Sequence, residues 1–129
     1  MHNLSLFATS LVILSISAAT AGAQARVALN EESHINSSLL SATIGAIIAK
    51  HCDAIVPRKL NAVMKAWQLK NYALRKGYSN EEIDAFLNSK TEQNRMKVAA
   101  NRYLKAQGVI VDQPATYCVA GLEIGRAHV

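Results

Sequence analysis

The sequence predicts an all-α fold, a small bundle of four to five short helices closed by one disulfide. Half of the 129 residues are hydrophobic, but only 5% are aromatic. Two prolines and six glycines give few breaks, which favours helices over many short strands. Apolar residues recur at spacings of three and four. The length excludes a multidomain enzyme, and the aliphatic content with a net charge of +5 excludes long disorder.

Residues 1–25 are predicted to be a secretory signal peptide. An uncharged apolar run over residues 4–17 is followed by small residues and by Ala-x-Ala sites that end at Ala23 and Ala25. The run is shorter than the roughly 20 residues that a membrane span needs. The first three residues include no Lys or Arg, which is atypical of a signal peptide. An uncleaved N-terminal anchor is the alternative. Cleavage would leave a protein of the periplasm or the extracellular medium.

The last seven residues, 123–129, are predicted to be an artefact and not native. They read Glu-Ile-Gly-Arg-Ala-His-Val, which a common short-read sequencing adapter encodes in one frame (GAG ATC GGA AGA GCA CAC GTC). The helical domain is then expected to comprise residues 26–122, and the natural gene to continue past Leu122. An ordinary hydrophilic tail is the alternative. No function is assigned to Arg126 or His128.

The first helix is predicted after Asn30, a suitable N-cap that Glu31 and Glu32 follow in the first turn. The apolar residues over 39–48 fall within about half of the helix circumference. That arc is typical of a central, mostly buried helix.

A second helix is predicted from about Pro57, which fits a first turn, to Gly77, a strong stop signal. Its large apolar residues form one stripe, which is expected to face the core. Trp67 is expected to be a core side chain and not one that stacks on a ligand. The stripe consists of Leu60, Val63, Met64, Trp67 and Leu74.

Two capping boxes predict the next two helix starts. Ser79 and Glu82 make the first, with apolar residues at both hydrophobic-staple positions. Ser89 and Glu92 repeat it and begin a new or kinked helix that ends at Gly108. The residues expected to face the core are Ile83, Phe86, Leu87, Met96, Ala99, Ala100, Tyr103 and Leu104.

Cys52 and Cys118 are predicted to form a structural disulfide, because extracytoplasmic compartments oxidise an even number of cysteines. The bond would join the end of the first helix to a short last helix that Asp112 caps, and it would close a loop of about 67 residues. The alternative makes Cys52, beside His51 and Asp53, a thiol nucleophile or a metal ligand. Adjacent residues point in different directions on a helix, so this triplet forms no site by itself.

No catalytic residue, cofactor or metal is expected. His34 and His51 lie 17 positions apart, which is not a metal-ligand spacing. Capping explains two of the carboxylates, and no calcium-binding loop, nucleophile elbow or phosphate-binding glycine loop occurs. A minor hydrolase or redox enzyme would need a cluster in a cleft, such as His34 meeting Asp84.

Arg58, Lys65 and Lys76 share one line of the second helix, opposite the apolar stripe, and no acid occurs between Asp53 and Glu81. They are the candidate partner-binding basic face, for an acidic protein or an anionic membrane surface. An ordinary solvated helix face is the alternative. Nucleic acid is not an expected partner, because the protein leaves the cytoplasm and lacks an aromatic and basic platform.

Residues 34–118 resemble a family of small secreted proteobacterial proteins of unknown function. The most specific part is Gly77-Tyr78-Ser79-x-x-Glu82-Ile83, and the resemblance ends at Tyr117-Cys118. We associate such genes with the neighbourhood of the proton-pumping NADH:quinone oxidoreductase. The resemblance therefore implies an accessory role and supplies no catalytic residue.

The leading functional hypothesis is a non-enzymatic interaction or accessory module, because structural signals are abundant and chemical ones are missing. The alternative is a carrier of a small apolar ligand within the bundle, which the wide aliphatic arc of the first helix suggests. An internal cavity of about 300 Å³ or more would favour the carrier.

Overall fold

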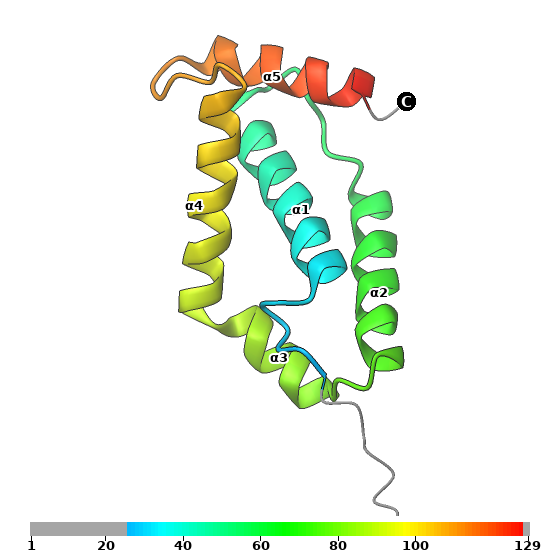
Figure 1. Ribbon diagram of the computed structural model, residues 1–129. Helices are drawn as coiled ribbons and strands as arrows, with labels where there is room; N and C mark the ends of the chain where they lie inside the picture. Colours follow the sequence, from blue (N-terminus) through cyan, green and yellow to red (C-terminus); the bar gives the residue numbers. More distant parts are fainter. Residues whose placement is uncertain (1–25, 128–129) are drawn as a thin grey trace, which may run out of the picture.

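The computed structural model describes residues 26–127, and these form five α-helices and no β-strand (Figure 1). The helices and the disulfide between Cys52 and Cys118 confirm the predicted all-α fold with one disulfide. The predicted signal peptide lies outside the described residues. The helices are α1 Ser33–His51, α2 Lys59–Arg75, α3 Asn80–Asn88, α4 Lys90–Ala106 and α5 Pro114–Ala127.

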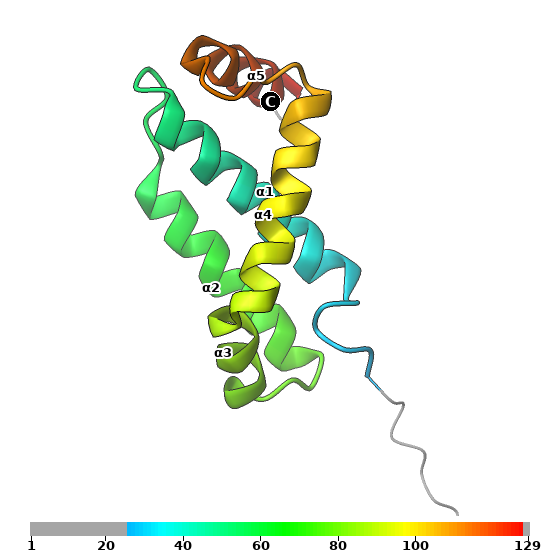
Figure 2. The ribbon, with the colours of Figure 1, turned by 90° about the vertical axis from the view of Figure 1, so that its left-hand side faces the viewer.

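Helix α1 is central: α2 and α4 flank it, α5 lies across one end of the bundle and α3 across the other (Figures 1 and 2). It is less buried than predicted, since Ile44 and Ile48 are in the core but Gly45 and Ala46 are exposed. Helix α5 continues to Ala127, well beyond the predicted end near Cys118. The origin of residues 123–129 stays a prediction.

The buried side chains form two clusters. The first joins α1, α4 and α5 around Leu104, which is 1% exposed. The second joins the start of α1, the end of α2 and α3. The first consists of Ile44, Ile48, Cys52, Ala100, Leu104, Val109, Tyr117 and Ala120, and the second of Ile35, Ala73, Tyr78 and Ile83.

The inward face of α4 is narrower than predicted. Met96, Ala100 and Leu104 are buried at intervals of four residues and face α1. Tyr103 falls at the edge of this line and is 38% exposed, so its predicted burial is wrong.

In α3, Leu87 is also wrongly predicted as a core residue. It is 46% exposed, because it lies at the last turn of α3 beside an open hollow.

Side-chain caps begin three of the helices. The Ser79 hydroxyl accepts from the Glu82 N–H at 3.1 Å, and the Glu82 carboxylate accepts from the Ser79 N–H at 2.6 Å, which confirms the first capping box. At α4 only the Ser89 half forms, because the Glu92 carboxylate pairs with Arg95 instead.

The predicted caps of α1 and α5 are not the ones observed. A turn over residues 28–32 places Glu32, and not Asn30, at the N-cap of α1. Asp112 lies in the turn before α5 with a positive φ of 69°. There the hydroxyl of Thr116 accepts from the N–H of Ile110 at 3.0 Å.

Cys52 and Cys118 are joined in a disulfide, as predicted, with their Cα atoms 5.2 Å apart. The bond fastens the end of α1 to α5. Cys52 is 1% exposed, and the ring of the preceding His51 stacks on Tyr117 at 4.4 Å between centroids. Because both cysteines of the chain are in this bond, Cys52 is neither a free thiol nor a metal ligand here.

The contact of α5 with α1 depends on Gly121. A Cβ atom there would collide with the Ile55 side chain and lie 2.8 Å from Cγ2 of Ile48, a stiff β-branched residue.

We expect Gly121→Ala to lower the free energy of unfolding by about 1–3 kcal/mol. Gly45→Ala, at a helical glycine with open space around it, should raise it by about 0.5–1 kcal/mol. Urea denaturation measures the change in the free energy of unfolding for both variants. A change of the same sign in both would contradict the close packing at Gly121.

Candidate docking surface

Helix α2 is attached to the bundle only through its C-terminal half. Ala73 is buried in the second cluster, and Leu69 and Tyr72 pack against that cluster. Every residue over 59–68 is exposed. The first half of α2 therefore stands at the edge of the molecule, where α2 is drawn in Figure 1.

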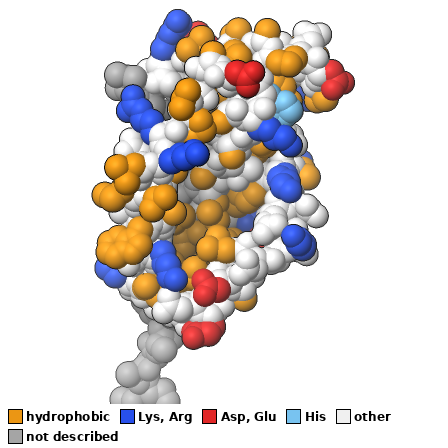
Figure 3. All heavy atoms as spheres, turned by 180° about the vertical axis from the view of Figure 1, so that it is seen from behind, with side chains coloured by type: hydrophobic (Ala, Val, Ile, Leu, Met, Phe, Trp, Pro, Cys, Tyr) orange, Lys and Arg blue, Asp and Glu red, His pale blue; other side chains and the backbone are white. Residues whose placement is uncertain are grey.

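The large apolar residues of this half face solvent. The exposed fractions are 76% for Leu60, 66% for Val63, 56% for Met64 and 69% for Trp67. Hydrophobic side chains accordingly gather along the α2 edge of the molecule, at the left of Figure 3. The prediction that the stripe faces the core, with Trp67 a core side chain, is wrong for these four residues. Only Leu74, at the C-terminal end, is half-buried and packs against the second cluster.

The physical reason is that α2 packs through its other face. At about 100° per residue, Leu69 and Ala73 lie on the side of the helix away from Trp67. The neighbouring Tyr72 hydroxyl donates to the Glu32 carboxylate at 2.8 Å, which fixes this face against the start of α1. We name Leu60, Val63, Met64 and Trp67 the α2 stripe.

The three residues of the predicted basic face, Arg58, Lys65 and Lys76, are all exposed. The Lys76 ammonium lies 5.5 Å from the centre of the Tyr72 ring. On the helix surface these three cations lie next to the packed face of α2. They are nevertheless exposed, as is the α2 stripe on the opposite side of the helix. Partner binding by this face stays a prediction.

Positive charge dominates the whole segment from 54 to 80, which contains six cations and no acid. Among the described residues, only Lys70 of the six has a carboxylate oxygen within 4.0 Å, that of Asp84 at 3.9 Å. The segment therefore keeps most of its charge uncompensated. The six cations are Arg58, Lys59, Lys65, Lys70, Arg75 and Lys76.

Glu32 is the polar residue that holds α2 in place. It is only 9% exposed, and its carboxylate accepts from the Ile35 N–H at 2.7 Å as well as from Tyr72. The Ile35 N–H, with help from the Tyr72 hydroxyl and the charge of Lys76, holds the pKa of Glu32 below its ordinary value of 4.5. The hydrogen bond from Tyr72 to Glu32 raises the pKa of Tyr72 above its ordinary value of 10.0.

This lowered pKa predicts that acid destabilises the fold at Glu32, which caps α1 and accepts the hydrogen bond from Tyr72 of α2. The folded protein favours the ionised carboxylate, so its contribution is complete above pH 4.5 and is lost as the pH falls through the lower folded value. Glu32→Gln should be less stable than the wild type at pH 7, by about 1 kcal/mol, and should lose less stability on acidification. Urea unfolding at neutral and acid pH measures both. Parallel losses in the two proteins would contradict this role.

Within the described residues, His34 and Asp84 have different partners and do not form the pair named above for a hydrolase site. The His34 ring meets the Tyr72 ring at 4.5 Å in an edge-on contact, while Asp84 faces Lys70. Within residues 26–127, no group of three His, Cys, Asp or Glu side chains is placed to hold a metal ion.

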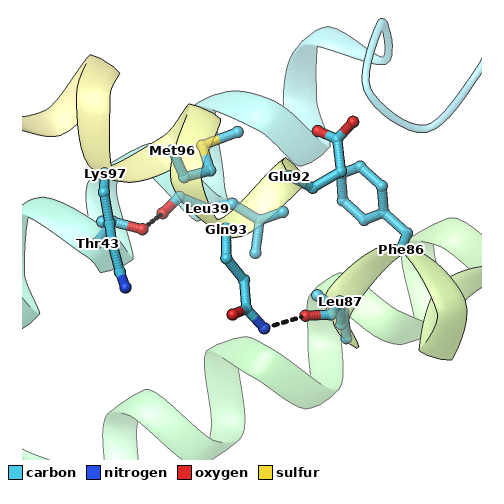
Figure 4. Close-up of a pocket in the computed structure, with 8 residues that line it drawn as sticks. All are labelled: Leu39, Thr43, Phe86, Leu87, Glu92, Gln93, Met96 and Lys97. Carbon is cyan, nitrogen blue, oxygen red and sulfur yellow. Dashed lines mark hydrogen bonds between the residues drawn. The ribbon is translucent and has the colours of Figure 1, made fainter. Parts of the chain in front are cut away.

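A pocket of about 200 Å³ opens between α1, α3 and α4 (Figure 4). In Figure 3 the surface is hollowed between α2 and α4, with hydrophobic side chains on its floor and Lys and Arg at its rims. A second open hollow, of about 460 Å³, lies at the entry to α1 beside Arg26 and Tyr78. Neither is an internal cavity. The 200 Å³ pocket is lined by Leu39, Thr43, Phe86, Leu87, Glu92, Gln93, Met96 and Lys97.

Comparison with known proteins identifies the family. A model described as "Family of unknown function (DUF5333)" matches residues 27–127. The chain belongs to this family. Neither a curated protein nor a solved structure matches it. The predicted resemblance to a domain of unknown function is thus confirmed, and the family description supplies no activity for the α2 stripe.

Proposed function

We propose that this DUF5333 protein is a non-enzymatic docking module that binds its partner through the α2 stripe. The observation that carries the proposal is the exposure of four large apolar side chains on one helix. Burial of each such side chain is worth about 1.5–3 kcal/mol. Contiguous exposed apolar surface of this kind marks interaction sites in soluble proteins.

We place the module outside the cytoplasm, in the periplasm or secreted through a cleaved signal peptide. A disulfide that uses both cysteines of the chain supports this, because oxidising compartments form and keep such bonds. The apolar run over residues 4–17 with its Ala-x-Ala sites supports export as well.

An accessory role beside the NADH:quinone oxidoreductase, in a proteobacterium, is the finer form of this proposal, and the resemblance of residues 34–118 supports it. The role would be one of attachment and not of electron transfer, since the sequence has no nucleotide, flavin or iron–sulfur motif. Carriage of a small apolar ligand is less well supported, because the pocket between α1, α3 and α4 is open and holds about 200 Å³.

Site-specific cross-linking in intact cells tests the docking role. A benzophenone amino acid replaces Trp67 in one variant and Val98, a 58% exposed residue of α4, in the control. We expect adducts from position 67 and not from position 98. Adducts that contain subunits of the oxidoreductase would support the accessory role. No adduct to protein or to lipid at position 67, or equal labelling from both positions, would contradict docking through α2.

A further inference from the structure

The first half of α2 has the character of a helix that lies on a membrane surface. Such helices place Trp and aliphatic residues on one face and carry Lys and Arg on the others. In α2 the stripe contains the only tryptophan of the chain, and the helix itself contains four cations and no acid. We propose that the partner of the α2 stripe is an anionic phospholipid bilayer. This inference rests on the docking role above and names its partner.

The position of the stripe suits a flat partner. Its four residues lie within about two turns, on the side of α2 away from Leu69 and Ala73, so they point out from the bundle. Val56, three residues before the helix begins, is another large apolar residue and is 80% exposed. A bilayer could therefore receive these side chains with no rearrangement of the described helices.

The cations beside the stripe would contact the headgroups. At about 100° per residue, Lys59, Lys70 and Arg75 flank the stripe on its two sides. Lysine and arginine side chains extend along apolar surface and keep their charge in the polar layer. Anionic lipids attract such clusters through uncompensated charge. Among the described residues Lys59 and Arg75 have no carboxylate oxygen within 4.0 Å, whereas Lys70 lies 3.9 Å from Asp84.

Other occupants fit less well. A second copy of α2 would bring a second set of cations against the first, with no acid between residues 54 and 80 to pair with them. A partner helix usually lies in an apolar groove. The 200 Å³ pocket is lined by α1, α3 and α4, and the α2 stripe lies on the side of α2 away from Leu69 and Ala73, so a helix seated in that pocket would leave the stripe uncovered. None of the helices in the described part is long and apolar enough to cross the bilayer.

Fluorescence of Trp67 tests the inference, because it is the sole tryptophan. The oxidised, exported protein is mixed with vesicles of phosphatidylglycerol or of phosphatidylcholine. We expect phosphatidylglycerol to shift the emission to shorter wavelength, and brominated acyl chains to quench it. Phosphatidylcholine should have little effect, and salt at roughly 0.5 M should weaken binding about tenfold or more, because it screens the headgroup charge.

A matched pair of variants keeps the reporter in place. Leu60→Ser with Met64→Ser should reduce the affinity for phosphatidylglycerol vesicles at least about tenfold, the factor that corresponds to 1.4 kcal/mol. Val98→Ser with Val119→Ser, at exposed residues of α4 and α5, should leave it unchanged. Circular dichroism checks that both variants fold.

No spectral shift with phosphatidylglycerol, or equal binding by both double variants, would overturn the lipid inference. If position 67 nevertheless cross-links to a protein in cells, the docking role stands and the partner is that protein. If position 67 gives no adduct in cells and the protein does not bind phosphatidylglycerol vesicles, both proposals fail.

Discussion

Replacement of both Cys52 and Cys118 by alanine is expected to lower the free energy of unfolding by about 4 kcal/mol. The two residues are 66 positions apart, and opening so long a loop restores a large conformational entropy to the unfolded chain. A domain of this size has a total stability of roughly 5–15 kcal/mol. The melting temperature should therefore fall by roughly 20 °C.

Urea unfolding of the double variant, compared with the wild type in the presence and absence of reductant, measures this loss. The reduced wild type and the double variant should have similar stability, because both lack the same cross-link. A reduced protein that unfolds at the same urea concentration as the oxidised one would contradict the clamp between α1 and α5.

Leu104→Ala is expected to have the next largest effect, about 2–5 kcal/mol, because the side chain is 1% exposed and its loss leaves a cavity among α1, α4 and α5. The same change at Leu60, which is 76% exposed, should alter the stability by no more than about 0.5 kcal/mol. Thermal and urea denaturation of the two variants measures the contrast.

This pair separates two arrangements of α2. If the α2 stripe faced the core, Leu60→Ala would also lower the free energy of unfolding by several kcal/mol. Similar losses at Leu60 and Leu104 would show that the first half of α2 is packed, and the α2 stripe would then not be a docking surface.

Much of the fold can be predicted because its signals are local or covalent. The capping box of Ser79 and Glu82 depends on residues three positions apart, and the structure contains it. The disulfide follows from the number of cysteines and the expected compartment. The start of α1 could not be placed correctly, because a turn over residues 28–32 uses Glu32 as the cap, a residue that would also suit a first turn.

The candidate site could not be predicted, because α2 has two apolar lines. One is the α2 stripe, made of large residues. The other consists of smaller side chains, and its C-terminal end packs against the second cluster through Leu69 and Ala73. The hydrogen bond of Tyr72 to Glu32 links residues 40 positions apart and helps to choose the second line. Helical periodicity contains no information about that contact. The second line consists of Ala62, Ala66, Leu69 and Ala73.

Collisional quenching of Trp67 in the free, oxidised protein shows whether the α2 stripe faces water, as the docking role requires. With the indole side chain 69% exposed, we predict emission and acrylamide quenching close to those of a free tryptophan derivative. Emission at shorter wavelength, with the indole protected from acrylamide until the protein is unfolded in urea, would show that Trp67 is buried and would contradict the account.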